Sequence, residues 1–132
     1  MKTQEYPKRN TKKGKGGFKR VYCACIYSRD GILAAWSEEQ GFRQVVLVAI
    51  VSCTLGFYFG ESFTQKILLI LPGFLCVIVE LFNSAIENAI DHTSIKPHPF
   101  AKKAKDMGSA AQFLSLLFVV VVWGVFCYER WF

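Results

Sequence analysis

Three long apolar segments constrain the fold of this chain more than any other feature of its sequence. They are VVLVAIVSCTLGFYF (45–59), ILLILPGFLCVIV (67–79) and FLSLLFVVVVWGVFCY (113–128). Each is shorter than the roughly 20 residues that cross a bilayer as a helix, but small or weakly polar neighbours extend each to that length. The chain has 132 residues, of which 52% are hydrophobic, so no polar segment is large enough to cover three such helices in water. The pattern predicts an all-α membrane protein with three transmembrane helices.

The remainder of the chain divides into a basic tail and one further helix. Residues 1–16 carry seven charges and show no apolar periodicity, which is typical of a disordered segment. From residue 18 onward, apolar side chains recur at helical spacing and indicate an amphipathic helix on the membrane surface. We therefore predict a disordered tail (1–16) followed by one membrane domain (17–132). The expected helices are a surface helix at about 18–42 and transmembrane helices at about 44–60, 66–91 and 107–128.

The placement of lysine and arginine predicts how the chain is oriented in the membrane. Ten of the sixteen precede the first apolar segment, and four lie between the second and the third. Loops on the cytoplasmic side carry an excess of these residues. The N-terminus and the 92–106 loop are therefore expected in the cytoplasm, and the 60–66 turn and the C-terminus on the opposite side.

A polar stripe continues the second apolar segment, in the sequence VELFNSAIENAID (79–91). At about 100° per residue, one helical face carries Glu80, Asn83, Ser84, Glu87 and Asp91. Polar groups at membrane depth are costly and mostly face a bundle interior or a water-filled cavity. If the helix begins at the outer surface, Glu80 lies about 20 Å down and Glu87 about 10 Å further, near the cytoplasmic boundary. A lipid hydroxyl can then reach Glu80, and a water-soluble anion can reach Glu87.

Further charged residues are expected on the cytoplasmic side, namely Glu38, Glu39, Lys105 and Asp106. Clustered carboxylates with lysines nearby suit a divalent metal that holds a polyphosphate, because Mg²⁺ takes one or two carboxylates plus phosphate oxygens. A carboxylate in a partly apolar site suits the role of general base for a hydroxyl, and Glu80 fits that role. No P-loop or protein-kinase motif occurs in the chain. The residues alone thus indicate an intramembrane carboxylate site.

Three motifs carry a resemblance to a known family. They are AAW-x-x-E-x-x-FRQ (34–44), VE-x-x-NSAIE-x-x-x-D (79–91) and AKDMGSAA (104–111). Together they resemble the prokaryotic integral-membrane diacylglycerol kinases, over about residues 17–127. The resemblance implies a homotrimer in the bacterial inner membrane, with three membrane helices and one surface helix per chain. It also implies transfer of the ATP γ-phosphate, with Mg²⁺, to the free hydroxyl of diacylglycerol, which gives phosphatidic acid in phospholipid recycling.

The resemblance implies roles for individual residues that match the family motifs. Glu80 matches the catalytic base and Asn83 the amide beside it. Glu39 and Glu87 match the carboxylates that hold the metal. The expected nucleotide-binding residues are Arg20, Tyr27, Glu39, Glu87, Lys96, Pro97, His98, Lys105 and Asp106. The expected lipid-binding residues are Arg20, Trp36, Glu80, Ser109 and Trp123.

Two alternative functions stay open at this point. A Gram-positive branch of the family resembles this chain in its acidic motif but phosphorylates undecaprenol, whereas DMGSAA looks more like the diacylglycerol branch. A small oligomeric ion or proton pathway would need polar groups throughout the bilayer, and the first and third segments offer only Ser52, Thr54 and Ser115. A nucleic-acid partner is not expected, because no aromatic pattern interleaves with the lysines of the tail.

Overall fold

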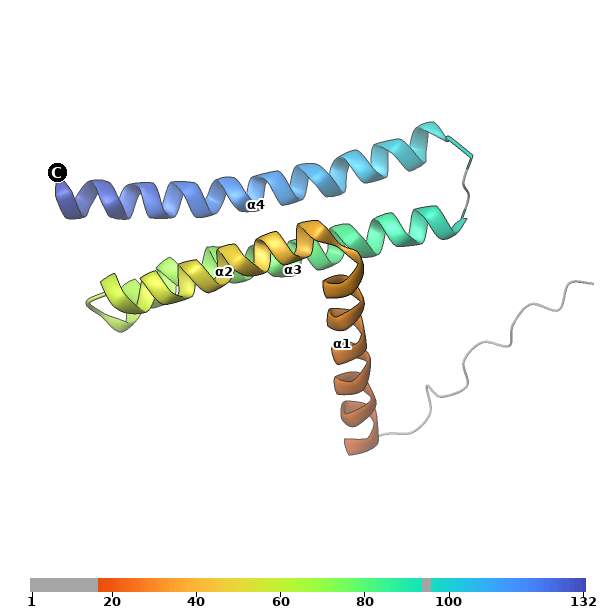
Figure 1. The fold of residues 1–132 in the computed structure, drawn as a ribbon, viewed down its shortest axis with the longest axis horizontal. Coiled ribbons are helices and arrows are strands. Elements are labelled where there is room, and N and C mark those ends of the chain that lie inside the picture. Colours follow the sequence, from red (N-terminus) through yellow and green to blue (C-terminus); the bar gives the residue numbers. More distant parts are fainter. Residues whose placement is uncertain (1–16, 94–95) are drawn as a thin grey trace, which may run out of the picture. The chain divides into compact units, whose positions relative to one another are not determined.

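The computed structural model describes residues 17–93 and 96–132. They form four helices in the order α1 (Phe18–Glu38), α2 (Gln40–Phe59), α3 (Phe63–Thr93) and α4 (Pro99–Trp131) (Figure 1). The described residues contain no strand, so the predicted all-α fold is confirmed. The tail predicted to be disordered, 1–16, lies outside the described residues.

Three of the helices, α2, α3 and α4, are long and apolar enough to cross a membrane. They have 20, 31 and 33 residues. At 1.5 Å per residue, about 20 residues match the hydrocarbon core of a bilayer, which is about 30 Å thick. The prediction of three membrane-crossing helices is therefore confirmed by length and composition. Both α3 and α4 start earlier and end later than the predicted ranges, so their ends extend past the hydrocarbon.

The chain divides after Leu33 into two units, of which the second begins at Ala34. The described part of the first unit is most of α1, where large side chains such as Val21, Tyr22 and Tyr27 are exposed. Exposed aliphatic and aromatic side chains on a helix with basic neighbours are typical of interfacial helices. The location of α1 on a membrane surface stays a prediction.

The helix expected to continue to about residue 42 ends at Glu38, which corrects that boundary. Glu39 has an extended backbone (φ −107°, ψ 113°) and is the N-cap of α2. The Arg43 guanidinium donates to the Trp36 carbonyl at 2.8 Å and to the Ser37 carbonyl at 3.4 Å. Carbonyls in the last turn of a helix have no donor within the helix. Arg43 therefore stabilises the end of α1 at this position.

Within the second unit, α3 packs against both α2 and α4 (Figure 1). Small residues let α2 and α3 approach closely. A Cβ added at Gly73 would lie 3.0 Å from Ser52 Cβ and 3.1 Å from Ala49 Cα. One added at Gly56 would lie 2.9 Å from Ile70 Cγ1. In a bilayer, close packing of this kind is a main source of attraction between helices.

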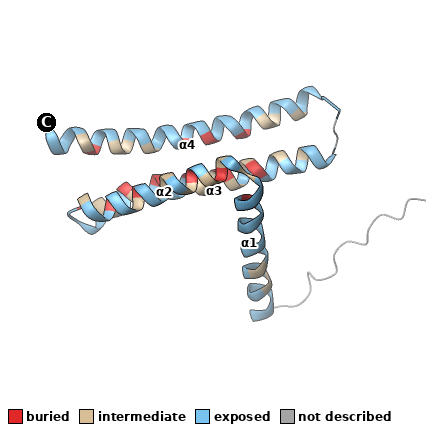
Figure 2. Ribbon diagram, in the orientation of Figure 1, coloured by how far each residue is buried: buried red, intermediate tan, exposed pale blue. Residues whose placement is uncertain are grey.

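The buried residues of α3 and α4 form one stripe on each helix (Figure 2). On α3 the stripe is apolar along its first half and becomes polar toward the C-terminal end of the helix. Its members are Leu69, Pro72, Gly73, Cys76, Glu80 and Ser84. On α4 the buried residues are Gly108, Gln112, Ser115 and Phe126. Large apolar side chains cover the exposed faces, as contact with lipid requires.

The start of α4 is defined by a histidine cap. His98 is extended (φ −135°, ψ 136°), and its Nδ1 accepts a hydrogen bond from the Phe100 backbone N–H at 3.2 Å. Pro99 occupies the first helical turn, where a missing N–H costs nothing. The helix therefore begins at residue 99 rather than near 107, which adds about two turns to its N-terminal end.

Candidate functional site

Carboxylates from two helices come together where the α3 stripe becomes polar. Glu80 is buried, with 7% of its surface exposed. Glu39 and Glu87 lie close enough to Glu80 to interact with it electrostatically. Glu39 is the N-cap of α2, yet its side chain makes no capping hydrogen bond. Three carboxylates from two separate sequence motifs therefore form one group, and the Glu39 side chain is not used to cap the α2 backbone.

Gly41 makes room for the Glu80 carboxylate. A Cβ added at Gly41 would collide with Glu80 Oε1 and lie 3.4 Å from Glu80 Cδ. Gly41 belongs to the first turn of α2, which begins at Gln40. The N–H groups of a first turn have no acceptor within the helix, and the helix dipole favours negative charge there. The start of α2 therefore lies where it can stabilise a buried carboxylate.

Asn83 links Glu80 to α4. Its side-chain amide lies within hydrogen-bonding reach of the Glu80 carboxylate. A carboxylate accepts hydrogen bonds, so Asn83 Nδ2 faces Glu80 and Oδ1 faces away. Oδ1 lies against Gly108, where an added Cβ would collide with it. Like Gly41, Gly108 is therefore a close-approach position beside a proposed catalytic side chain.

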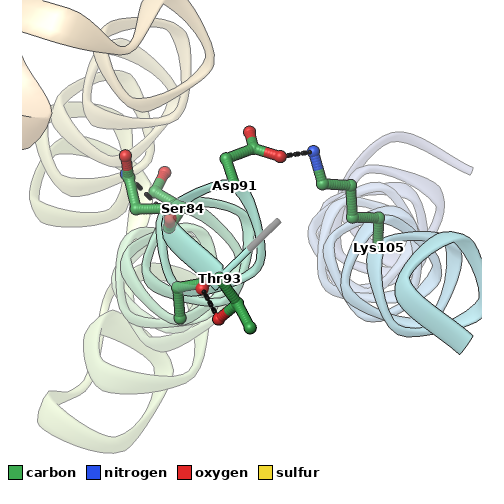
Figure 3. A network of polar contacts seen from close by, with 6 residues as sticks. Ser84, Asp91, Thr93 and Lys105 are labelled. Atoms are coloured by element: carbon green, nitrogen blue, oxygen red, sulfur yellow. Dashed lines mark hydrogen bonds and ion pairs between the residues drawn. The ribbon is translucent and has the colours of Figure 1, made fainter. Parts of the chain in front are cut away.

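An ion pair joins the C-terminal end of α3 to the N-terminal end of α4. Lys105 Nζ lies 2.5 Å from Asp91 Oδ1, and Figure 3 shows the two side chains pointing toward one another between the helices. Lys105 also interacts electrostatically with Glu87. A pair exposed to water contributes little to stability. Its main consequence is the position of Lys105, which lies beside the carboxylates.

Two hydrogen bonds within α3 occupy other polar groups near this end of the helix. Asn88 Nδ2 donates to the Ser84 carbonyl at 2.9 Å, and Thr93 Oγ1 donates to the Ala89 carbonyl at 2.7 Å (Figure 3). Both bonds are local to the helix. Asn88 and Thr93 are therefore better explained as helix-stabilising residues than as ligands.

Five further predicted site residues in the second unit lie in the first part of α4 and in the connection before it. Asp106 and Ser109 flank Gly108 on α4 and are exposed. Lys96 and Pro97 are exposed in the connection before α4, and His98 caps that helix. Their predicted contacts with the nucleotide and the lipid stay predictions.

Two predicted lipid contacts are tryptophans. Trp36 is 49% exposed near the end of α1. Trp123 is half-buried, and its ring contacts that of Phe126 with centroids 5.8 Å apart. Since Trp123 lies fifteen residues after Gly108, it is about 22 Å away along the α4 axis. The structure thus does not bring Trp123 to the carboxylate group. The remaining predicted contacts, Arg20 and Tyr27, lie in the first unit and are exposed.

The donor set fits a metal that arrives with its own ligands. Across residues 17–93 and 96–132, no three His, Cys, Asp or Glu side chains form a group that could hold an ion by themselves. Glu39 and Glu87 supply two carboxylates, the number that Mg²⁺ takes from a protein when phosphate oxygens complete its coordination. The site therefore suits a magnesium–polyphosphate complex better than a resident structural ion.

Comparison with known proteins places the chain in a family. Residues 26–127 match the family model described as prokaryotic diacylglycerol kinase. The chain belongs to the prokaryotic diacylglycerol kinase family. Members of a diacylglycerol kinase family are lipid kinases, which use ATP as phosphoryl donor. The resemblance predicted from the three motifs is confirmed, and the matched residues contain all three of them.

Relatives with the same description cover most of the chain. A diacylglycerol kinase of Helicobacter pylori strain 26695 is 52% identical over 108 residues, which are 82% of this chain and 84% of the relative. One of Pseudomonas aeruginosa is 46% identical over 111 residues, 84% and 90% of the two chains. One of Escherichia coli K12 is 33% identical over 114 residues, 86% and 93% of the two chains.

Sequence reasoning missed two features of this diacylglycerol kinase site: the glycines that let helices approach closely, and the ion pair between α3 and α4. Gly41 and Gly108 were assigned no role, and Asp91 was placed on the polar stripe without its partner Lys105. One signal could have found the glycines. Glycine inside a helix is less favourable than alanine by about 1 kcal/mol, so a glycine in a helical motif indicates a close approach.

Proposed function

We propose that this protein transfers the γ-phosphate of ATP to the free hydroxyl of diacylglycerol and so produces phosphatidic acid, in phospholipid recycling. The observation that carries the proposal is the buried Glu80 beside Glu39 and Glu87, at the end of an apolar helix. A lipid hydroxyl can reach such a carboxylate from the bilayer, and a nucleotide can reach its neighbours from water. The relatives named diacylglycerol kinase support the choice of lipid.

Glu80 is the proposed general base. It accepts the proton of the lipid hydroxyl while that oxygen attacks the γ-phosphorus in line. The bond between the γ-phosphorus and the bridging oxygen breaks, and ADP leaves. Asn83 holds the Glu80 carboxylate through its side-chain amide, which lies within hydrogen-bonding reach. The start of α2 at Gly41 limits where Oε1 can lie.

Glu39 and Glu87 are the proposed ligands of Mg²⁺, together with phosphate oxygens of ATP. When bound, the ion would neutralise charge on the polyphosphate. Lys105 pairs with Asp91 and lies near Glu87, which supports a contact of its ammonium group with the same phosphates. The other proposed nucleotide contacts are Arg20, Tyr27, Lys96, Pro97, His98 and Asp106. The proposed lipid contacts are Arg20, Trp36, Glu80, Ser109 and Trp123.

We also propose that the protein lies in the bacterial inner membrane with its N-terminus in the cytoplasm and its C-terminus in the periplasm. The distribution of lysine and arginine supports this orientation. So does the site itself, because ATP is cytoplasmic and the Lys105–Asp91 pair lies beside the α3–α4 connection. A homotrimer is proposed from the family resemblance. The extensive exposed apolar surface of the single chain is compatible with such an assembly.

Product analysis tests the proposed reaction. Purified protein in detergent micelles would receive γ-labelled ATP and Mg²⁺ with either diacylglycerol or undecaprenol, and labelled lipids would be separated by thin-layer chromatography. We expect labelled phosphatidic acid, and no labelled product from a Glu80→Gln control in the same time. Label only in undecaprenyl phosphate would move the protein to the other branch of the family. No labelled lipid with either substrate would contradict kinase activity.

A further inference from the structure

Two buried polar atoms on facing helices have no hydrogen-bond partner within the described part of the chain. They are Asn83 Oδ1 on α3 and Gln112 Nε2 on α4. The first is an acceptor and the second is a donor. Each is costly to leave unpaired away from water, so native structures rarely do so. A third such atom, Trp123 Nε1, lies about 16 Å further along α4 than Gln112, too far to pair with either.

The backbone places these two groups one helical turn apart. Asn83 Oδ1 lies against Gly108. Gln112 is four residues after Gly108, on the same face of α4 and about 6 Å along its axis. Side chains on a helix lean toward its N-terminus, so Gln112 covers the turn that contains Gly108. Gln112 is itself buried, with 9% of its surface exposed, and it therefore lies in the α4 stripe that contains Gly108.

The opposite end of the Gln112 side chain is already held. Buried Ser115 donates its hydroxyl to the Gln112 backbone carbonyl at 2.8 Å and lies 3.4 Å from Gln112 Oε1. Since Oε1 faces a hydroxyl donor, Nε2 is the end of the carboxamide that is left to donate.

We propose that Gln112 is a positioning residue that donates to Asn83 Oδ1 and thereby holds Asn83 Nδ2 toward Glu80. The result is a chain of hydrogen bonds with one polarity, from Ser115 to Gln112, from Gln112 to Asn83, and from Asn83 to Glu80. Each donor in it has an acceptor, and aligned hydrogen bonds strengthen one another in a low-dielectric setting. The inference rests on the proposed function to the extent that Glu80 is the base.

This arrangement gives Gln112 a specific task. An asparagine amide can rotate by half a turn, which would place Oδ1 against the carboxylate and Nδ2 against α4. A donor on α4 disfavours the rotated state, because Nδ2 and a second donor cannot pair. Gly108 contributes by leaving the space in which Oδ1 and the Gln112 amide can meet.

Kinetics of a donor-less variant test the assignment. Gln112→Leu keeps a side chain of similar size but leaves the buried Asn83 acceptor unpaired, so we expect kcat for diacylglycerol to fall about 10-fold. KM for ATP should not change, because Glu39, Glu87 and Lys105 are untouched. Gln44→Leu is the matched control, because it makes the same replacement at an exposed position on α2. The kcat of this variant should stay at the wild-type value.

A double-mutant cycle separates positioning from packing. In an Asn83→Ala background the acceptor is absent, so Gln112→Leu should cost no further activity. Ser115→Thr keeps the hydroxyl and should keep kcat, whereas Ser115→Ala should lower it. The proposal would be overturned if the double variant lost kcat by the product of the two single losses, those of Gln112→Leu and Asn83→Ala. Such a result would show that the two residues act independently.

A measurement without turnover distinguishes failure of this inference from failure of the proposed function. In full-length ¹⁵N-labelled protein in detergent, the Gln112 side-chain amide can be assigned by its loss in Gln112→Leu. We expect slow exchange of its protons with D₂O, and faster exchange in Asn83→Ala. Exchange as fast as that of the Gln44 side chain would overturn the proposal. Exchange of the Gln112 amide protons that stays slow in Asn83→Ala would also overturn the proposal. The acceptor of that amide would then lie elsewhere, such as in a second copy of the chain.

Discussion

At the scale of single residues, the site depends on carboxylates in two different settings. Glu80 is buried and lies within reach of the Asn83 amide. Glu39 and Glu87 are half-buried, so water and a nucleotide can reach them. A buried carboxylate is suited to accept a proton from a lipid hydroxyl, and carboxylates that water can reach are suited to bind a hydrated cation. One helix face and one helix cap thus supply both kinds of group.

Replacement of Glu80 by glutamine tests the base. Glu80→Gln preserves shape and hydrogen bonding but cannot accept the proton, so kcat should fall at least about 100-fold, the lower end of what a positioned base contributes. Binding of ATP should change little because Glu39 and Glu87 remain. The thermal midpoint of the variant should be at least that of the wild type, since a buried charge is removed. Near wild-type turnover would show that another group takes the proton.

Replacement of the two half-buried carboxylates, Glu39 and Glu87, tests the metal site. Glu39→Gln and Glu87→Gln should each raise the Mg²⁺ concentration needed for half-maximal rate and lower turnover strongly, because one carboxylate with phosphate oxygens holds the ion loosely. Mg²⁺ titrations of the initial rate provide the measurement, with Glu38→Gln as the control on the neighbouring exposed residue. Normal activity of both variants at low millimolar Mg²⁺ would contradict the assignment.

At the scale of elements, α3 is the helix on which the site is assembled. Its buried stripe contacts α2 and α4, and glycines on both partners face its polar groups. Ion pairs connect both ends of the α3–α4 pair: Lys105 with Asp91 at one end, and Arg130 with Glu61 at the other. The relative register of α3 and α4 is therefore constrained at two points, which keeps Gly108 opposite Asn83.

Alanine substitutions of glycines test the close approaches. Gly41→Ala and Gly108→Ala would collide with Glu80 Oε1 and Asn83 Oδ1, which are the ends of flexible side chains. These side chains can turn away, so the fold should persist while kcat falls about 10- to 100-fold through misplacement. Gly124→Ala is the control, because an added Cβ meets nothing within 4 Å there. Thermal unfolding and initial rates of the three variants, measured in parallel, would decide. Equal rates for all three would refute the role of the two glycines.

At the scale of the whole molecule, the chain is a set of membrane-crossing helices with chemistry at one end. The Lys105–Asp91 pair lies beside the α3–α4 connection, whereas the C-terminus lies at the opposite end of α4 (Figure 1). Large apolar side chains remain exposed along all three long helices. Such surfaces are suited to lipid and to neighbouring copies rather than to water.

The orientation in the membrane can be tested with reporters. An enzyme that is active only in the periplasm should be active when fused after Phe132, and an enzyme that is active only in the cytoplasm should be active in the 92–101 connection. The reason is that four lysines lie between the second and third apolar segments, and ten of the sixteen lysines and arginines precede the first. The reverse pattern would remove ATP from the proposed site and so contradict the proposed reaction as well.

Local patterns in the sequence were enough to predict the helices and the polar face of α3. Apolar length alone determines that α2, α3 and α4 can cross a bilayer, because each helix satisfies its own backbone hydrogen bonds. The 3.6-residue period determines that Glu80, Asn83 and Glu87 share a face. The family motifs identified the chemistry, since they include these same residues.

Tertiary structure alone decided which groups meet across helices. The break at Glu39 follows from the hydrogen bonds of Arg43 to Trp36 and Ser37, which no local propensity predicts. The same holds for the fit of Gly41 to Glu80 and of Gly108 to Asn83. The period of a helix determines the faces of that helix only. How two faces pair depends on side-chain volumes and ion pairs between segments far apart in the sequence, and those act only once the helices have packed.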